Sequence, residues 1–135
     1  MPSIPIINET IETSTRVEMV DVTELVQKAV RQNSVKDGYA IIQIPHTTAG
    51  ITINEHADPD VKQDILKKLD ALIPHIEPYY QHDEGNSDAH IKTSLMGSSV
   101  TVLIDNGRLV LGRWQGIFLC EFDGGRERQV IMMIR

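Results

Sequence analysis

The chain has 135 residues, 41% of them hydrophobic, and a formal net charge of −6. This length favours one domain over residues 1–135, because two domains would each bury too little apolar surface. The acidic balance argues against sequence-independent binding of nucleic acid, which needs a basic surface, and no apolar run reaches the ~18 residues of a membrane span. With no signal-peptide pattern, and with its single cysteine, Cys120, in an apolar stretch, the sequence predicts a cytoplasmic protein in which that thiol is buried.

The first half of the chain alternates extended and helical patterns. β-Branched residues are frequent in the extended segments, and apolar residues spaced three and four apart indicate helices. Gly50 is expected to separate two strands, and Asp58 followed by Pro59 has the residue types preferred where a helix begins. In chain order, these patterns predict extended chain over 3–20, a helix from 21–23 to 33, strands over 39–44 and 51–54, and a helix over 58–74.

The second half begins with a polar, irregular segment, 74–86, in which Gly85 is expected to act as a hinge. A short helix then starts at Ser87 or Asp88 and closes at Gly97. The DNG and DGG sequences are typical of tight turns between strands, which are predicted over 98–105, 108–112, 116–123 and 129–134. The order ββ-helix-ββ-helix-βββ predicts an α+β domain with much antiparallel sheet.

Three of the five histidines lie at predicted junctions, where functional side chains are common. His46 ends a strand, His82 lies in the irregular segment, and His90 lies in the first turn of the short helix. Three neutral imidazoles that leave one position for water form a typical catalytic zinc site, and Asp88 is near enough in sequence to orient an imidazole. The spacing lacks the local geometry of an HExxH motif, so dispersed polar or interface histidines remain the alternative.

The cations of the last 35 residues are all arginines. Arginine presents a fixed fork of donors suited to carboxylate or phosphate, so Arg113, Arg126 and Arg128 are candidates for an anion site. The alternative is that they are surface or interface arginines whose stems cover apolar groups.

Acid–base work is a second possible role near the His46 segment. Asp58 and Asp60 are explained by the positive end of the helix that they begin, which leaves Glu55 as the candidate carboxylate. Trp114 and Gln115 can stack on a ring and hydrogen-bond to it, although a lone tryptophan is as readily a packing anchor.

Three ordered blocks make the sequence resemble the YjbQ-like family, small proteins of bacteria and archaea also called secondary thiamine-phosphate synthases. The blocks are HTTAGITINEHADPDV (46–61), the segment 82–97 with GNSDAHIKTSLMG, and SVTVLIDNGRLVLGRWQGI (99–117). The resemblance runs from about residue 8 to the end. One departure is Arg113, which stands where the family usually has threonine before Trp-Gln.

The resemblance implies an α+β fold of two packed, mostly antiparallel sheets with helices on one side, assembled as a homotrimer. It also implies histidines gathered around a divalent metal, which is zinc, or magnesium with a diphosphate substrate. The family's polar positions correspond here to His46, Thr48, Asn54, Glu55, His82, Asp88, His90, Lys92, Trp114 and Gln115.

The sequence and the resemblance together predict a pocket for a small anionic or phosphorylated metabolite. The predicted roles are metal ligation by His46, His82 and His90, catalysis by Glu55, Asp88 and Lys92, and ligand binding by Thr48, Asn54, Arg113, Trp114, Gln115 and Arg128.

Three functions use these residues, and the family name favours the first. It is a weak thiamine-phosphate synthase, in which a metal, Lys92 and arginines stabilise the leaving pyrophosphate. The chain is too short for the TIM barrel that normally performs this step. The second is a metal-assisted phosphate-ester hydrolase with Glu55 as base, and the third is a non-catalytic trimer that binds a small anion or a metal.

Overall fold

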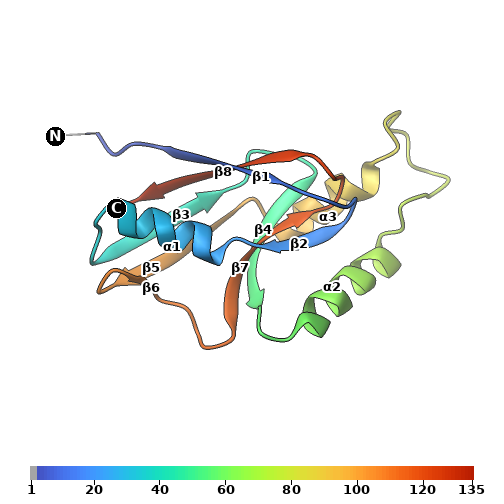
Figure 1. Cartoon of the computed structure of the whole chain (residues 1–135). Coiled ribbons are helices and arrows are strands. Elements are labelled where there is room, and N and C mark those ends of the chain that lie inside the picture. The colour runs from blue at the N-terminus through green and yellow to red at the C-terminus, as the bar shows by residue number, and fades with distance from the viewer. Residues whose placement is uncertain (1–2) are drawn as a thin grey trace.

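Two antiparallel sheets and three helices make up the computed structural model, which describes residues 3–135 (Figure 1). The larger sheet has the strand order β1-β8-β3-β5-β6, and the smaller has the order β2-β7-β4. The strands are β1 (Ile7–Glu12), β2 (Glu18–Asp21), β3 (Gly38–Gln43), β4 (Ala49–Glu55), β5 (Ser99–Asp105), β6 (Arg108–Leu109), β7 (Gln115–Glu121) and β8 (Glu127–Ile134). The helices are α1 (Thr23–Gln32), α2 (Pro59–Leu72) and α3 (Ser87–Met96).

The main hydrophobic core lies between the two sheets and includes one face of α1. Val26 and Val30 of α1 are completely buried, as are Ile42 of β3 and Leu119 of β7. These side chains come from alternate positions of the strands and from one face of the helix, as expected for elements half-buried against one core. The α+β prediction with two packed sheets is confirmed.

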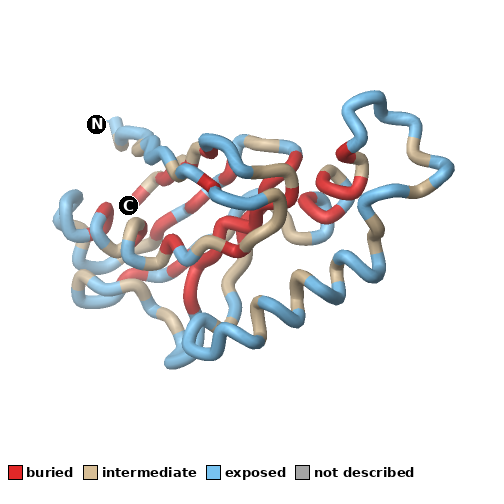
Figure 2. The backbone as a smooth tube through the Cα atoms, turned by 45° about the vertical axis from the view of Figure 1, so that its right-hand side comes forward, coloured by how far each residue is buried: buried red, intermediate tan, exposed pale blue. Residues whose placement is uncertain are grey.

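A second, smaller core lies on the opposite face of the three-stranded sheet, where α2 and α3 pack. Phe118 and Phe122 belong to this core, and Ile65 and Leu69 of α2 pack against it. Every position of β7 from Gly116 to Glu121 is buried, because the strand is covered on both faces. Figure 2 shows α2 without a fully buried position, as a cover at the edge of the molecule.

Several local predictions are confirmed by the backbone. Asp58 caps α2, since its Oδ1 accepts a hydrogen bond from the Asp60 N–H at 2.9 Å, with Pro59 in the first turn. Asn106 and Gly107 have φ values of 51° and 78°, as a tight hairpin turn requires, and join β5 to β6. Cys120 is fully buried, and this burial raises the pKa of its thiol to about 12.

Two details differ from the expected pattern. Gly50 lies inside β4 instead of forming a turn. A glycine is needed at this position because a Cβ would come within 2.6 Å of the carbonyl oxygen of Gly97, the residue at which α3 ends. The strand predicted over 108–112 is cut to two residues, since Gln115 Oε1 accepts a hydrogen bond from the Gly112 N–H and bends the chain there. The first cause is a contact between residues far apart in the sequence, and the second is a local contact between residues three apart.

The outer face of the five-stranded sheet carries apolar side chains that no helix within residues 3–135 covers. Ile41 of β3 is 36% exposed and Leu103 of β5 is 62% exposed. Within residues 3–135, no helix has both the length and the apolar character needed to span a bilayer.

Candidate functional site

A polar cavity of about 670 Å³ opens where the end of β3, the start of β8 and α3 meet. Its walls come from segments far apart in sequence. Histidines, hydroxyls and arginines predominate among its lining residues: Gln43, Ile44, Pro45, His46, Thr47, Thr48, His82, Glu84, Asn86, His90, Ser98, Asp123, Arg126 and Arg128. The structure therefore brings His46, Thr48, His82, His90 and Arg128 together as predicted site residues.

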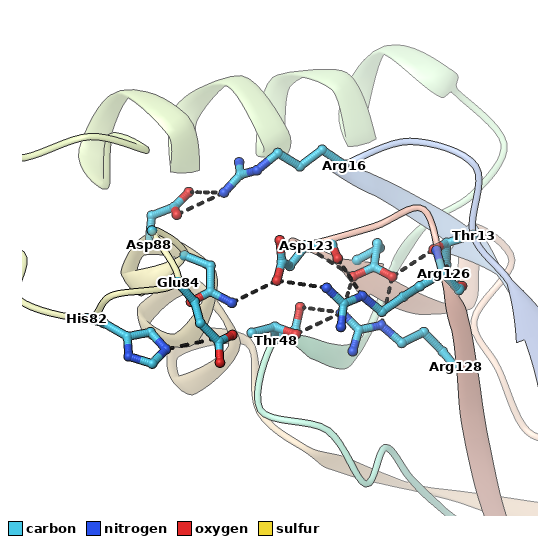
Figure 3. Close-up of polar contacts among 12 residues, drawn as sticks. Thr13, Arg16, Thr48, His82, Glu84, Asp88, Asp123, Arg126 and Arg128 are labelled. Carbon is cyan, nitrogen blue, oxygen red and sulfur yellow. Dashed lines mark hydrogen bonds and ion pairs between the residues drawn. The ribbon is translucent and has the colours of Figure 1, made fainter.

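A buried ion pair forms the base of the cavity (Figure 3). Arg128 on β8 donates from Nε and Nη2 to the carboxylate of Glu121 on β7, the Nε contact measuring 2.7 Å. Arg128 Nη2 also donates to Thr48 Oγ1, and Thr13 Oγ1 donates to Glu121. Burial alone would raise the pKa of Glu121, but the hydrogen bond from Arg128 and those from the Asp123 N–H and Thr13 hold it below its usual value.

His46 is fixed as a neutral ring by the backbone of β8. Its Nε2 accepts a hydrogen bond from the Gln129 N–H at 2.9 Å, so the ring hydrogen is carried by Nδ1. The pKa of His46 is lowered first by burial and then by the positive charge of Arg128; Glu121 opposes this change, and Arg126 adds a smaller lowering. His46 is thus a hydrogen-bond donor beside two arginines.

A second polar cluster forms another wall of the cavity. Arg126 donates from Nη2 to Asp123 Oδ2 at 3.1 Å and from Nε to the Asp123 carbonyl oxygen. Asn86, which precedes α3, donates from Nδ2 to the same Asp123 oxygen. The contacts of Arg126 and Arg128 use Nε and Nη2, which leaves the Nη1 groups of both arginines without a partner among residues 3–135.

His82 and His90 stand at the mouth of the cavity. Their rings meet edge to face with centroids 5.3 Å apart. His82 is half-exposed and lies 4.0 Å from a carboxylate oxygen of Glu84. These two rings therefore form an aromatic wall that solvent reaches.

Asp88 and Lys92 of α3 lie outside the lining of this cavity, in a separate buried ion cluster. Lys92 Nζ donates to Asp88 Oδ2 and to Asp70 Oδ1, each at 3.2 Å, and Arg16 Nη2 donates to both oxygens of Asp88. Burial would raise the pKa of Asp88, but the hydrogen bonds from Arg16 and Lys92 lower it. The cluster ties α3 to α2 and to the turn between β1 and β2.

The remaining predicted residues lie at the other end of β4 and β7, and form a far-end cluster. Since β4 rises ~3.3 Å per residue, this end is roughly 20 Å from Thr48. Glu55 accepts the Ala57 N–H and pairs across the sheet with Gln115, while the guanidinium of Arg113 stacks 4.6 Å from the centroid of Trp114. The cluster consists of Asn54, Glu55, Arg113, Trp114 and Gln115.

The metal site inferred from His46, His82 and His90 is not formed. Within residues 3–135, no group of three or more His, Cys, Asp or Glu side chains is arranged to hold a metal ion. The physical reason lies in His46, whose Nε2 lone pair already accepts from Gln129 and whose Nδ1 bears the hydrogen. Zinc or magnesium as a cofactor stays a prediction without a ligand set to support it.

Sequence reasoning missed several residues of the cavity's polar framework, among them Asn86, Glu121 and Asp123. Glu121 had a signal, because it is the one charged residue in the apolar run GIFLCEF, and a charge in a buried strand needs a partner. Asn86 precedes a predicted helix and could be read as a cap. Its role beside Asp123 depends on the packing of α3 against the turn between β7 and β8.

Fold and cavity together define a small two-sheet α+β protein with an arginine- and histidine-lined cavity at one end of the sheets. Residues 8–135 match the family model described as UPF0047 protein YjbQ-like, and the chain belongs to this family. It is 54% identical over 124 residues to UPF0047 protein MJ1081 of Methanocaldococcus jannaschii, covering 92% of this chain and 89% of that one. It is 51% identical over 118 residues to UPF0047 protein YugU of Bacillus subtilis, covering 87% and 89%.

Solved structures of similar proteins have the same fold. A conserved YjbQ/UPF0047 family protein from Clostridium acetobutylicum is 54% identical, with a TM-score of 0.93 over 96% of this chain and 99% of that one. The protein TT1486 of Thermus thermophilus is 41% identical, with a TM-score of 0.90 over 96% and 99%.

The predicted function, a metal-binding pocket with thiamine-phosphate synthase activity, is wrong. The relatives' names assign only the UPF0047 family and no such synthesis, and no metal-binding group forms among residues 3–135. The alternative function, a metal-assisted hydrolase, is wrong for the same reason, because it requires the same three histidines as metal ligands. What survives is the location of the histidines, which do line one cavity.

Proposed function

We propose that the polar cavity binds a small anion, such as the phosphate or carboxylate group of a metabolite. The observation that carries this proposal is the fixed state of His46. Its accepting nitrogen is occupied by the Gln129 N–H, so the ring offers a donor, and it does so beside two guanidinium groups.

The donors in the cavity wall suit an oxyanion. Thr47 and Ser98 add hydroxyls, and the Nη1 groups of Arg126 and Arg128 have no partner among residues 3–135. Charge-assisted hydrogen bonds from arginine to phosphate or carboxylate are about twice as strong as neutral ones. A neutral imidazole N–H beside them adds a donor at no cost in charge repulsion.

The electrostatic field supports the same ligand class. Burial lowers the pKa of His46 most, Arg128 lowers it further, and Glu121 opposes this change more than Arg126 adds to it. The positive charge of Arg128 beside the ring supports a bound anion. Glu121 keeps Arg128 in place by pairing on the buried side of the guanidinium.

Calorimetric titration with inorganic phosphate at moderate salt tests the proposal. We expect binding by the wild-type protein, and we expect Arg126→Met to weaken it roughly tenfold or more, because one charge-assisted hydrogen bond is lost. Arg113→Met is the matched control: it removes the same charge, but from the far-end cluster, and should leave the affinity unchanged.

Two results would contradict the proposal. Phosphate that releases no heat and protects no amide near the cavity would show that the site does not bind it. Equal weakening by Arg113→Met and Arg126→Met would show that the binding depends only on net charge.

We propose in addition that the protein forms a homotrimer in the cytoplasm. The uncovered outer face of the five-stranded sheet, with Ile41 and Leu103 exposed, supports self-association, and a single buried cysteine suits a reducing compartment. Native mass spectrometry tests the assembly, with an expected mass three times the 15.2 kDa of one chain. A monomer under the same conditions would contradict it, and Leu103→Glu should lower the assembly state if that face is the interface.

A further inference from the structure

We infer that the anion recognised by the polar cavity is carried on an aromatic ring, which lies in a second cavity next to it. This inference rests on the proposed function and adds the chemical class of the ligand. The second cavity, called here the tyrosine cavity, has a volume of about 600 Å³ and is lined by Tyr79, Tyr80, Gln81, His82, Ser87, His90 and Ile91.

The two cavities are neighbours that share two side chains. His82 and His90 line both of them, and their rings meet edge to face at 5.3 Å. A ligand with its charged group among the arginines must therefore pass these two imidazoles if it extends toward the tyrosines.

The tyrosine cavity has the chemistry of a ring-binding site. Tyr79 and Tyr80 meet edge to face with centroids 5.3 Å apart, and Tyr80 is held in place by its hydroxyl, which donates to the Pro74 carbonyl oxygen at 2.9 Å. With the two imidazoles, four aromatic rings line this open depression, and such rings contact a further planar ring in stacked or edge-to-face geometry. Ile91 adds an apolar contact from α3.

Exposure of these side chains has a cost that a ligand would remove. Tyr79 is 72% exposed and Ile91 is 41% exposed. Single exposed hydrophobic residues are ordinary, but here they form one apolar surface that adjoins a cavity with convergent polar groups. The combination of an apolar cavity and a few oriented polar groups is typical of a site for a small organic ligand.

Calorimetric titrations with four probes test the inference: phenyl phosphate, ethyl phosphate, benzoate and inorganic phosphate. Phenyl phosphate should bind about tenfold more tightly than ethyl phosphate, because the ring buries more apolar surface at the same charge. Tyr79→Ala should remove this advantage and leave the affinity for ethyl phosphate unchanged. Tyr79→Phe, which keeps the ring, should retain it, and both variants should fold because the side chain is mostly exposed.

The outcomes separate this inference from the proposed function. If phosphate and ethyl phosphate bind and Arg126→Met weakens both, while phenyl phosphate gains nothing, the ring site is refuted and the anion site stands. If none of the four probes binds, the anion site fails and the ring site fails with it. A Tyr79-dependent gain for benzoate over inorganic phosphate, without one for phenyl phosphate, would assign the ligand as an aromatic carboxylate.

Discussion

Replacing Arg128 with methionine tests the buried ion pair under the polar cavity. The substitution removes the hydrogen bonds to Glu121 and to Thr48 while keeping most of the apolar volume. The Glu121 carboxylate would remain fully buried, with only the Thr13 hydroxyl and the Asp123 N–H as donors. An uncompensated buried charge is the expected result.

The loss of unfolding free energy follows from the burial of both partners: the side chain of Arg128 is 3% exposed and that of Glu121 is 0% exposed. Breaking a buried ion pair in this way costs about 3–5 kcal/mol of unfolding free energy. With an unfolding entropy of about 2.1 cal/mol/K per residue, this corresponds to a fall in Tm of roughly 11–18 °C for a chain of this length. Most domains have an unfolding free energy of about 5–15 kcal/mol, so the variant should still fold at room temperature.

Urea unfolding followed by circular dichroism, at a fixed protein concentration, measures the loss. The difference in unfolding free energy between the wild type and Arg128→Met should be largest near neutral pH and should become smaller in acid. Without Arg128, burial raises the pKa of Glu121 above its unfolded value, so the carboxyl folds most easily when it is protonated. In the wild type the pKa shift of Glu121 has the opposite sign, because its pKa is lower in the folded protein than in the unfolded chain. The ion pair therefore stabilises the fold above the unfolded pKa of Glu121. That stability is lost as the pH falls through the folded pKa.

A double variant, Arg128→Met with Glu121→Leu, is the control. It removes both charges and should recover much of the lost stability. A single variant that loses less than about 1 kcal/mol, or a double variant as unstable as the single one, would refute the reasoning.

Three further predictions concern other parts of the fold. Asp58→Ala should cost about 1 kcal/mol in urea unfolding, because it removes the cap of α2, and an unchanged midpoint would mean that the cap carries no energy. Gly50→Ala should cost about 1–3 kcal/mol, since its new Cβ would lie 2.6 Å from the Gly97 carbonyl oxygen; a variant as thermostable as the wild type would show that this close approach is absent. Burial and the nearby arginines lower the pKa of His46 in the folded protein. As the pH falls, the imidazole is therefore protonated in the unfolded chain before it is protonated in the folded protein. The folding stability that depends on neutral His46 is complete above pH ~6.5 and is lost as the pH falls below that value. His46→Gln should flatten that part of the curve of unfolding free energy against pH, and an unaltered curve would argue against the assigned state of the ring.

Local patterns in the sequence were sufficient for most elements of the fold. The helix start at Asp58 and the turn at Asn106 and Gly107 depend on residues adjacent in the chain, and both are formed as predicted. Gly50 was misread because its reason lies in a contact with Gly97, 47 positions away in the printed sequence. Such contacts have no signal in the spacing of apolar residues.

The site was predicted in part for the same reason. Junction positions identified His46, His82 and His90, which line one cavity, because loops at the end of a sheet come together. The state of His46 could not be predicted, since a backbone N–H of β8 decides which ring nitrogen carries the hydrogen. Glu55 was grouped with His46 by its closeness in sequence, but β4 is an extended strand and carries Glu55 to its far end.

Nitrogen-15 NMR of the histidine rings, recorded during a titration with inorganic phosphate, tests the central claim most directly. The account predicts that His46 has a hydrogen on Nδ1 and a bare Nε2 near neutral pH, and that the Nδ1–H resonance shifts as phosphate saturates the cavity. Arg126→Met should weaken that saturation, whereas Arg113→Met should not. A hydrogen on Nε2, or an Nδ1–H resonance that phosphate leaves unmoved, would contradict the claim that His46 is a neutral donor in an anion-binding cavity.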